Sequence, residues 1–324
     1  PNSPQFVVAY FACARLGCIV TGVNPTYKPA EVLHQLQVTG ARTLIVLDAL
    51  YDALIAPNLG TIAIDHVIVT NIADLMDLSM IKRALGRLLG KIPTARVPAP
   101  AHSMTGLLRA PAVPPRVAIG VHEPAVYLMT GGTTGVPKAA MLSHFNCVAN
   151  AWQCRQWLYR FDDQSANLGV LPLFHAFAMT TIMNASIITG AWMMLFPRPP
   201  ATEELVARIA ALGPENRTMY AGAEVLFRRL ADMPGIESAG IARRFSLCVS
   251  GAGPLHRSVQ EAFEARTGAR LVEGYGLTEA GTILRAPMGM AEPGPCGWLR
   301  PDYEDWLVDE HDIEVPVGQV GELI

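Results

Sequence analysis

Short apolar runs alternate with amphipathic runs along most of the chain. The early predicted strands are CIVTGVNP, TLIVLD and HVIVT, and the predicted helices beside them are FVVAYFACARLG and PAEVLHQLQVTG. From residue 125 onward the predicted strands are AVYLMT, ANLGVLP, TMYAG, FSLCVSG and RLVEGYG, with a predicted helix in most of the intervals. Continuously apolar strands separated by helices are typical of parallel sheets covered on both faces. The pattern therefore predicts an α/β fold.

Two changes of composition along the chain interrupt this pattern. Prolines gather at about 86–118 with little periodicity, which predicts a connection between two α/β subdomains, residues 1–118 and 119–290. After about residue 287 glycines and prolines precede the short runs EDWLVDE and GELI, so residues 291–324 are predicted to begin a small β subdomain. Because the chain starts without Met and stops within a predicted strand, we expect it to be part of a longer protein.

Composition excludes some classes of function. The 324 residues are 51% hydrophobic, enough for a large buried core, and the formal net charge of -3 argues against nucleic-acid binding. The six cysteines show neither CxxC pairs nor zinc-ligand spacing, which favours buried free thiols in a reducing compartment. The first residues do not resemble a signal peptide, so a cytoplasmic location is expected.

One long stretch without charge needs a membrane test. Residues 174–197 contain no Asp, Glu, Lys or Arg, and their length nearly matches a bilayer. However, three threonines, Asn184, Ser186 and Gly190 interrupt the apolar content. This pattern favours a buried helix over about Ala176–Ile188, a glycine turn and the buried strand AWMMLF.

The segment YLMTGGTTGVPKAAMLSH, residues 127–144, is the most informative motif. It is not a Walker A loop, because Lys138 follows Pro137 and precedes Ala139. Its chemistry still favours phosphate, since glycines expose backbone N–H groups, hydroxyls donate to oxygen and a lysine adds a mobile charge. A mobile hairpin turn is the simpler alternative, but such turns are usually Asn-Gly or Asp-Gly. The candidate phosphate ligands are Thr130, Gly131, Gly132, Thr133, Thr134, Gly135 and Lys138.

The segment GYGLTEA, residues 274–280, suits the same ligand. Tyr275 offers a flat face for a base, and Gly274 and Gly276 leave room around it. Thr278 and Glu279 place a hydroxyl beside a carboxylate, which together suit a phosphate oxygen and Mg²⁺. Taken alone, an exposed turn explains this segment equally well.

Two further segments lie where predicted strands give way to helices. SGAGPL, residues 250–255, occupies the position at which open α/β sheets bind ligands, although a tight turn explains it as well. It is not a dinucleotide fingerprint, because His256 stands at the third glycine position. LPLFHAFAM, residues 171–179, places His175 at such a junction, where a lone histidine is more often structural than functional.

These motifs, followed by the terminal GQVGELI, occur in the order typical of the adenylate-forming, AMP-binding superfamily, which the whole chain resembles. The superfamily includes acyl-CoA synthetases, aryl-CoA ligases, peptide-synthetase adenylation domains and firefly luciferase. Residues 1–41 resemble bacterial long-chain fatty acid–CoA ligases most. The resemblance implies a two-step reaction: a carboxylate and ATP give an acyl-adenylate and pyrophosphate, and coenzyme A then displaces AMP. It also implies Mg²⁺ as the metal.

The resemblance implies a role for each motif. Residues 130–135 and Lys138 would handle the β- and γ-phosphates, Thr278 the α-phosphate, and Glu279 with Thr130 the Mg²⁺. His175 would border the acyl carboxylate. The implied catalytic set is Lys138, His175, Thr278 and Glu279. The implied adenine site, with Tyr275 stacked on the base, is Gly251, Ala252, Gly253, Glu273, Gly274, Tyr275 and Gly276.

Some family features differ here. Ala139 stands where a glycine is usual, and TMYAGAEVLF lacks the Val-Pro pair that often precedes the pocket helix, which puts the shape of the pocket in doubt. The family's ribose-binding aspartate, hinge and lid with a catalytic lysine would follow Ile324. We therefore expect the chain by itself to bind nucleotide weakly and to turn over poorly.

Other functions remain as alternatives. An aryl-CoA ligase fits the same motifs. An amino-acid adenylation domain fits less well, because LFHAFAM lacks an acidic residue for the substrate amine. A non-catalytic nucleotide- or acyl-binding module is a third alternative. The expected partners are a carboxylic acid, ATP and coenzyme A, and both a homodimer and peripheral association with the inner membrane face are left open.

Overall fold

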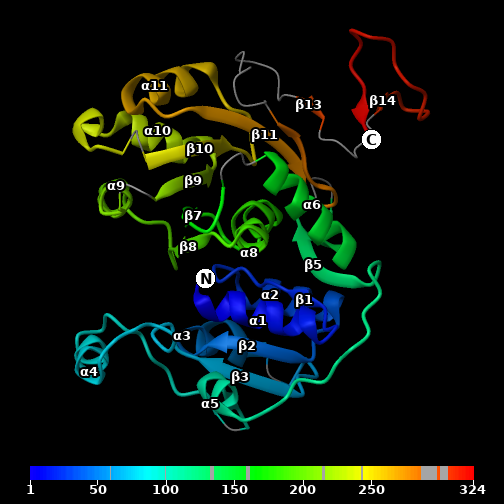
Figure 1. Cartoon of the computed structure of the whole chain (residues 1–324). Coiled ribbons are helices and arrows are strands. Elements are labelled where there is room, and N and C mark those ends of the chain that lie inside the picture. The colour runs from blue at the N-terminus through cyan, green and yellow to red at the C-terminus, as the bar shows by residue number, and fades with distance from the viewer. Residues whose placement is uncertain are drawn as a thin grey trace.

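The structure is a computed structural model of the chain, shown in Figure 1. It describes all residues except 59, 99, 132–134, 158–160, 214–215, 242–243, 286–297 and 300–305. For residues 157, 282–285 and 298–299 it describes the backbone alone.

The described elements follow the alternation of the sequence. The helical elements are α1 (Pro4–Arg15), α2 (Pro29–Thr39), α3 (Asp48–Leu50), η1 (Tyr51–Ile55), η2 (Ala56–Asn58), α4 (Met80–Leu88), α5 (Met104–Arg109), α6 (His144–Trp157), α7 (Ala176–Ala178), η3 (Met179–Asn184), α8 (Ala185–Thr189), α9 (Thr202–Ala210), α10 (Glu224–Asp232), η4 (Ile236–Ser238) and α11 (Arg257–Thr267). The strands are β1 (Val20–Thr21), β2 (Thr43–Leu47), β3 (His66–Thr70), β4 (His102–Ser103), β5 (Pro124–Thr130), β6 (Lys138–Ser143), β7 (Ser165–Gly169), β8 (Trp192–Leu195), β9 (Arg217–Gly222), β10 (Phe245–Ser250), β11 (Leu271–Leu277), β12 (Gly281–Arg285), β13 (Trp298–Leu299), β14 (Leu307–Val308) and β15 (Glu322–Leu323).

A first parallel sheet has the order β2-β3-β4. Its core joins Leu44 and Val46 of β2 to Val32 and Leu36 of α2, so the amphipathic helix covers one face of the sheet. On the other face lies α5, as Figure 1 shows. The sequence predicted no element at 102–109, because β4 has two residues and Met104 alone of the six in α5 is buried.

A second sheet has the order β1-β5-β6, with β1 parallel to β5 and β5 antiparallel to β6. The strand predicted over CIVTGVNP shrinks to Val20–Thr21. The reason is that the Gly22 carbonyl accepts a hydrogen bond from the Gln35 side chain, 3.1 Å away, and the chain then turns toward Pro25. Pairing of β5 with β6 confirms the two strands predicted on either side of the glycine-threonine loop.

The largest sheet has the order β13-β12-β11-β10-β9-β7-β8. Strands β11, β10, β9, β7 and β8 run parallel, and β12 and β13 add antiparallel pairs at one side. Helices α9, α10 and α11 cover one face, and α6 and α8 cover the other (Figure 1). Neighbouring residues of β9 point to opposite faces of the sheet. Tyr220 belongs to the hydrophobic core that contains Phe227 and Phe263, and Met219 belongs to the core that contains Ile182. The predicted α/β fold with parallel sheets between helices is therefore confirmed.

The uncharged stretch forms the predicted buried helix as α7, η3 and α8. It then forms β8, which is not buried as predicted: Trp192 is 37% exposed, because β8 stands at the end of the strand order of its sheet. Within it η3 is a π-helical turn, in which carbonyl groups lose their regular partners. The side chain of Asn167 on β7 donates to the carbonyls of Thr181 at 2.8 Å and Ile182 at 3.3 Å, which satisfies them inside the core. Gly190, with φ of 78°, ends the helix. Within the described ranges the structure contains no helix with the length and apolar content that a bilayer crossing requires.

Near the end of the chain β14 pairs antiparallel with β15, as the runs EDWLVDE and GELI predicted. The domain limits at residues 118 and 290 stay predictions. Five cysteines are free thiols, and Cys296 lies outside the described residues. Burial raises the pKa of the Cys147 thiol to about 11, against a lowering by its hydrogen bond with Tyr10.

Candidate functional site

Three parallel strands bring glycine backbones together where they end. The N–H of Gly251, just after β10, donates to the carbonyl of Gly222 at the end of β9, 3.0 Å away. A Cβ atom on Gly251 would lie 3.2 Å from the carbonyl oxygen of Gly274 in β11 and 2.9 Å from the ring of Phe177 in α7. Because the carboxyl ends of parallel strands form the ligand edge of open α/β sheets, these contacts define one wall of a candidate site.

The loop from Gly251 to His256 rises from this wall toward α11. Ala252 adopts the left-handed backbone conformation, with φ of 63°, which a residue with a Cβ rarely does. The backbone N–H of Leu255 donates to the Glu273 carboxylate, 2.9 Å away. Glu273, a predicted adenine-site residue, thus braces the loop. The neighbouring Gly253 faces open space, since a Cβ there would meet nothing within 4 Å.

A second carboxylate, which the sequence did not single out, fixes the far end of the same loop. Glu224, the first residue of α10, accepts from the backbone N–H of His256 at 2.7 Å and lies 2.5 Å from its Nδ1 atom. It also pairs with Arg228 at 2.6 Å. Desolvation raises the pKa of Glu224, but the hydrogen bonds from His256 and Arg228 outweigh this effect and lower the pKa to about 2. The only sequence feature that could have drawn attention to Glu224 is its place at the start of a predicted helix, where an acidic residue is favourable.

The glycine-threonine loop joins β5 to β6 in the second sheet. Thr130 and Lys138 are paired across the hairpin, and the Thr130 hydroxyl lies 3.4 Å from the Lys138 carbonyl oxygen. The imidazole Nε2 of His34 on α2 lies 3.1 Å from the Pro137 carbonyl oxygen, so the end of the loop contacts α2. Gly131 is exposed, and a Cβ there would meet nothing within 4 Å. The predicted ligands Gly132, Thr133 and Thr134 lie outside the described residues.

The segment GYGLTEA differs in form from the expected turn. Strand β11 continues through Leu277, and residues 278–280 alone form the turn, because β12 pairs antiparallel with β11 from Gly281 onward. Tyr275 is half-buried in β11, and Glu279 is exposed at the turn. In the part of the chain that the structure describes, neither the Glu279 carboxylate nor the Lys138 ammonium forms an ion pair.

Helix α6 supports both the hairpin and this turn. It begins at His144, directly after β6, and packs against β12, where a Cβ on Gly281 would lie 2.6 Å from the Asn150 side-chain oxygen. Figure 1 shows α6 between β5 and the β11–β12 hairpin. No hydrogen bond between described residues joins the side chains of Thr130 or Lys138 to those of Thr278 or Glu279, so their meeting around one ligand stays a prediction.

His175 lies where the sequence placed it, after β7 and immediately before α7. It is exposed, and its carbonyl accepts the first hydrogen bond of the helix from Met179 at 2.8 Å. The loop before it is held by Asn2, which is buried and donates to the carbonyls of Gly169 and Leu171, each at 2.8 Å. The Asn2 side-chain oxygen also accepts from the N–H of Leu173 at 2.8 Å.

Asn2 thus reaches about 170 positions along the sequence to fix the approach to His175. Sequence reasoning missed it. A single polar residue near the chain start carries no signal for a partner so distant in sequence.

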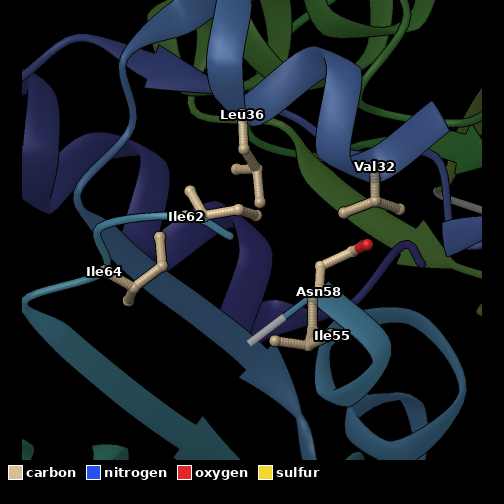
Figure 2. Close-up of a pocket in the computed structure, with 6 residues that line it drawn as sticks. All are labelled: Val32, Leu36, Ile55, Asn58, Ile62 and Ile64. Atoms are coloured by element: carbon tan, nitrogen blue, oxygen red, sulfur yellow. The ribbon is translucent and has the colours of Figure 1, made fainter. Parts of the chain in front are cut away.

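A cavity elsewhere contains none of the predicted site residues. Figure 2 shows that its side chains come from α2, η1, η2 and the segment before β3. They belong to or border the core of the first sheet, and the polar exception, Asn58, donates to the Pro29 carbonyl at 2.7 Å. An apolar cavity of this kind does not suit a polyphosphate. The lining residues are Val32, Leu36, Ile55, Asn58, Ile62 and Ile64.

Oxygen donors suited to Mg²⁺ are present at the predicted positions. Glu279 offers an exposed carboxylate and Thr130 a hydroxyl, the hard oxygen ligands that Mg²⁺ takes. Among the described residues no group of three or more His, Cys, Asp or Glu side chains could hold a metal. Protein ligands this few suit an ion that arrives with the phosphates of a nucleotide.

Comparison with known proteins identifies the class that this fold and site define. The model of the AMP-binding enzyme family matches residues 1–324, and the chain therefore belongs to that family. It is 32% identical to a long-chain fatty acid–CoA ligase of Bacillus subtilis (strain 168), over all of the chain and 58% of that protein. It is 30% identical to 4-coumarate–CoA ligase 5 of Oryza sativa subsp. japonica, over all of the chain and 56% of that protein.

A solved structure agrees with the fold. A long-chain fatty acid–CoA ligase from Archaeoglobus fulgidus superimposes with a TM-score of 0.74 at 22% identity, over the whole chain and 60% of that structure. The chain thus spans a little more than half the length of the relatives it matches.

Proposed function

We propose that this chain is the nucleotide- and acyl-binding part of an ATP-dependent fatty acyl-CoA ligase. The complete protein would join a fatty acid to AMP and then transfer the acyl group to coenzyme A. The observation that carries the proposal is the meeting of the Gly251 loop with Gly222, Gly274 and Phe177 at the carboxyl ends of the parallel strands. Family membership over the whole chain supports the same reaction class.

The adenine site in this proposal is the wall around Gly251 and Gly274. Glycine at position 251 lets the strand ends and Phe177 pack closely into this wall, and Gly253 leaves open space beside the loop. Glu273 keeps the loop in place through the Leu255 N–H, and Tyr275 offers its ring for stacking. We assign Ala252, Gly253 and Gly276 to the same site.

The triphosphate site in this proposal is the β5–β6 loop. Lys138 is an exposed cation without an ion pair in the described structure, so its charge is available to the β- and γ-phosphates. Glu279 and Thr130 would hold Mg²⁺, which neutralises phosphate charge and polarises the P–O bonds when bound. Thr278 is assigned to the α-phosphate.

The chemistry requires two anions to approach. A carboxylate oxygen of the acid attacks the α-phosphorus, and pyrophosphate leaves. Lys138 and Thr278 would place a cation and a hydroxyl donor where negative charge accumulates, and His175 would fix the acyl carboxylate at the entrance to α7. In the second step the thiolate of coenzyme A attacks the acyl carbonyl carbon and AMP leaves.

A fatty acid is the proposed acyl substrate, because the similarity to long-chain fatty acid–CoA ligases extends over the whole chain. An aryl acid is the second candidate. The observation that favours it is the equally complete match to a coumarate–CoA ligase at 30% identity.

The direct test is pyrophosphate release by the complete protein with a panel of fatty and aryl acids. Release with alkyl acids and dependence on chain length supports the proposal, and release with aryl acids alone replaces it by the second candidate. The variants Lys138→Ala and Glu279→Gln should each slow adenylate formation at least about tenfold, because each removes a charge from the site. Unchanged rates in both would overturn the assignment of these residues.

A binding experiment tests the chain itself. Titration with a non-hydrolysable acyl-adenylate analogue should show binding that depends on the acyl group. Absence of binding to both this chain and the complete protein would favour a non-catalytic module.

A further inference from the structure

Helix α4 is amphipathic, but its apolar side faces solvent. Met80, Ala84 and Leu88 form one row along the helix, and Ile81, Leu85 and Leu89 form the next. The side chain of Met80 is 87% exposed and that of Leu88 is 83% exposed. All nine residues of α4 are described, and none is buried. Apolar surface on this scale usually marks a site of interaction.

The helix is held to the protein by its polar side. Arg83 and Gly86 are its least exposed residues. The Arg83 guanidinium donates to the carbonyl of Met76 at 2.7 Å and to that of Leu78 at 3.2 Å. Ile92 folds back onto Gly86, where an added Cβ would lie 2.7 Å from its Cδ1 atom. The apolar rows are therefore turned outward by specific contacts, and Figure 1 shows α4 projecting from the side of the first sheet.

Cations predominate from the start of α4 onward, although Asp74 and Asp77 lie just before the helix. Residues 78–122 contain seven lysines and arginines and no Asp or Glu, although the whole chain carries a net charge of -3. Three of these cations, Lys82, Arg83 and Arg87, lie on α4 beside the apolar rows, and Lys91 follows directly. This segregation indicates an anionic partner.

A second copy of the chain is a poor occupant for this surface. Self-association through α4 would place the same cations opposite each other, and like charges in contact are unfavourable. A projecting helix also presents a ridge, which a protein partner must match with a complementary groove. A lipid surface needs no such groove, because acyl chains adapt to the side chains that enter them.

We propose that α4 is a membrane-docking helix for anionic phospholipid. Its apolar rows enter the boundary between headgroups and acyl chains, and Lys82, Arg87 and Lys91 contact the phosphates. This inference does not depend on the ligase function. If both hold, the surface would place the protein at the layer in which its acyl substrate dissolves.

Vesicle flotation of the purified chain tests the proposal. One vesicle type contains phosphatidylcholine alone, and the other contains about one third phosphatidylglycerol, which supplies the negative surface potential. We expect the chain to float with the second type and not with the first, and added salt to weaken this binding.

Two variants separate the apolar and the electrostatic contributions. The double variant Leu85→Ser with Leu88→Ser should lower the membrane–water partition coefficient at least about tenfold, because the transfer of two leucine side chains from water into the membrane is lost. Arg87→Glu with Lys91→Glu should lower it at least about twentyfold and remove most of the salt dependence. All four side chains are exposed, so circular dichroism and the urea midpoint should stay unchanged.

Matched controls lie on other elements. Val38→Ser on α2, which is 48% exposed, and Arg15→Glu on α1 change the same chemistry away from α4 and should leave flotation unaltered. Failure to bind anionic vesicles would overturn the proposal, as would equal losses in the controls. So would a dimer in solution that the α4 variants abolish, because that result would assign the apolar rows to a second copy.

Discussion

The loop after β10 and the loop between β5 and β6 are both rich in glycine, but the two use it differently. At Gly251 an added Cβ would lie 2.9 Å from the Phe177 ring and 3.2 Å from the Gly274 carbonyl oxygen. At Gly131 and Gly135 it would meet nothing within 4 Å. The first loop belongs to a packed edge and the second to an open hairpin.

This difference separates two reasons for glycine in one site. At the packed edge, glycine lets three strand ends and α7 approach each other, so it shapes the wall. In the open hairpin, no contact in the described structure requires glycine. Its remaining use there is to keep the backbone N–H groups accessible to a ligand. Substitutions at the packed edge should therefore lower stability, whereas those in the hairpin should lower ligand binding alone.

The largest loss of stability is expected for Asn2→Ala. Three hydrogen bonds to the loop before His175 disappear, two of them buried and one part-buried, and about 3 kcal/mol of unfolding free energy should be lost at about 1 kcal/mol each. Urea unfolding measures this. Asn24→Ala is the control, because the hydrogen bonds that the Asn24 side chain accepts from described residues come from Thr26, two positions away at an exposed turn. Equal effects of the two variants would contradict a special role for Asn2.

A somewhat smaller loss is expected for Gly251→Ala. The new methyl group would press on Phe177 and on a backbone carbonyl that cannot move freely, at a cost of about 1–3 kcal/mol. Thermal or urea unfolding reports the change. Gly253→Ala, two residues away in open space, should unfold like the original chain. A stable Gly251→Ala variant would show that the edge is not tightly packed.

Glu224→Gln should cost about 1–2 kcal/mol near neutral pH, because the carboxylate charge that accepts hydrogen bonds from His256 and Arg228 is removed. The pKa of Glu224 is lowered from 4.5 to about 2 in the folded chain. As pH falls, the Glu224 carboxylate is therefore protonated in the unfolded chain before it is protonated in the folded chain. The stabilisation is complete above about pH 4.5 and is lost as pH falls toward 2.

Urea midpoints at neutral and acidic pH test this sign. The difference between the original chain and Glu224→Gln should narrow at acidic pH. Glu204→Gln, whose partner Arg208 lies 4.0 Å away on the exposed face of α9, should show little effect at either pH. A gap that stays constant with pH would mean that the Glu224 charge does not stabilise the fold.

The smallest effects on stability are expected in the hairpin. Lys138→Ala and Gly135→Ala should change the unfolding free energy by less than about 0.5 kcal/mol, because both positions are exposed. Under the proposed function, Lys138→Ala should nevertheless weaken binding of a non-hydrolysable ATP analogue at least about tenfold, since a charged hydrogen bond to phosphate is lost. Calorimetric titration measures this, with Lys28→Ala at the N-cap of α2 as the control. Unweakened binding would exclude Lys138 from the triphosphate site.

The sequence predicted local elements well where they were long and apolar. The buried helix from Ala176 was confirmed, because a continuous apolar run indicates burial without reference to its neighbours. AWMMLF forms strand β8, but the prediction that this strand is buried was wrong, because β8 stands at the end of the strand order of its sheet. The sequence could not predict β12 or the two-residue β4. Such segments become strands because they pair with the free edge of a neighbouring strand, and their own composition does not indicate this pairing.

By itself, the sequence determined the alternation of strands and helices, the family motifs, and the residue types of the candidate site, because these depend on local spacing and chemistry. Only the tertiary structure decided which of these residues touch. Asn2 reaches the loop before His175, Glu224 holds His256, and α4 turns its apolar rows outward, and none of these follows from periodicity. The physical reason is that such contacts depend on the packing of elements far apart in the chain, where direction and distance are set by the whole core.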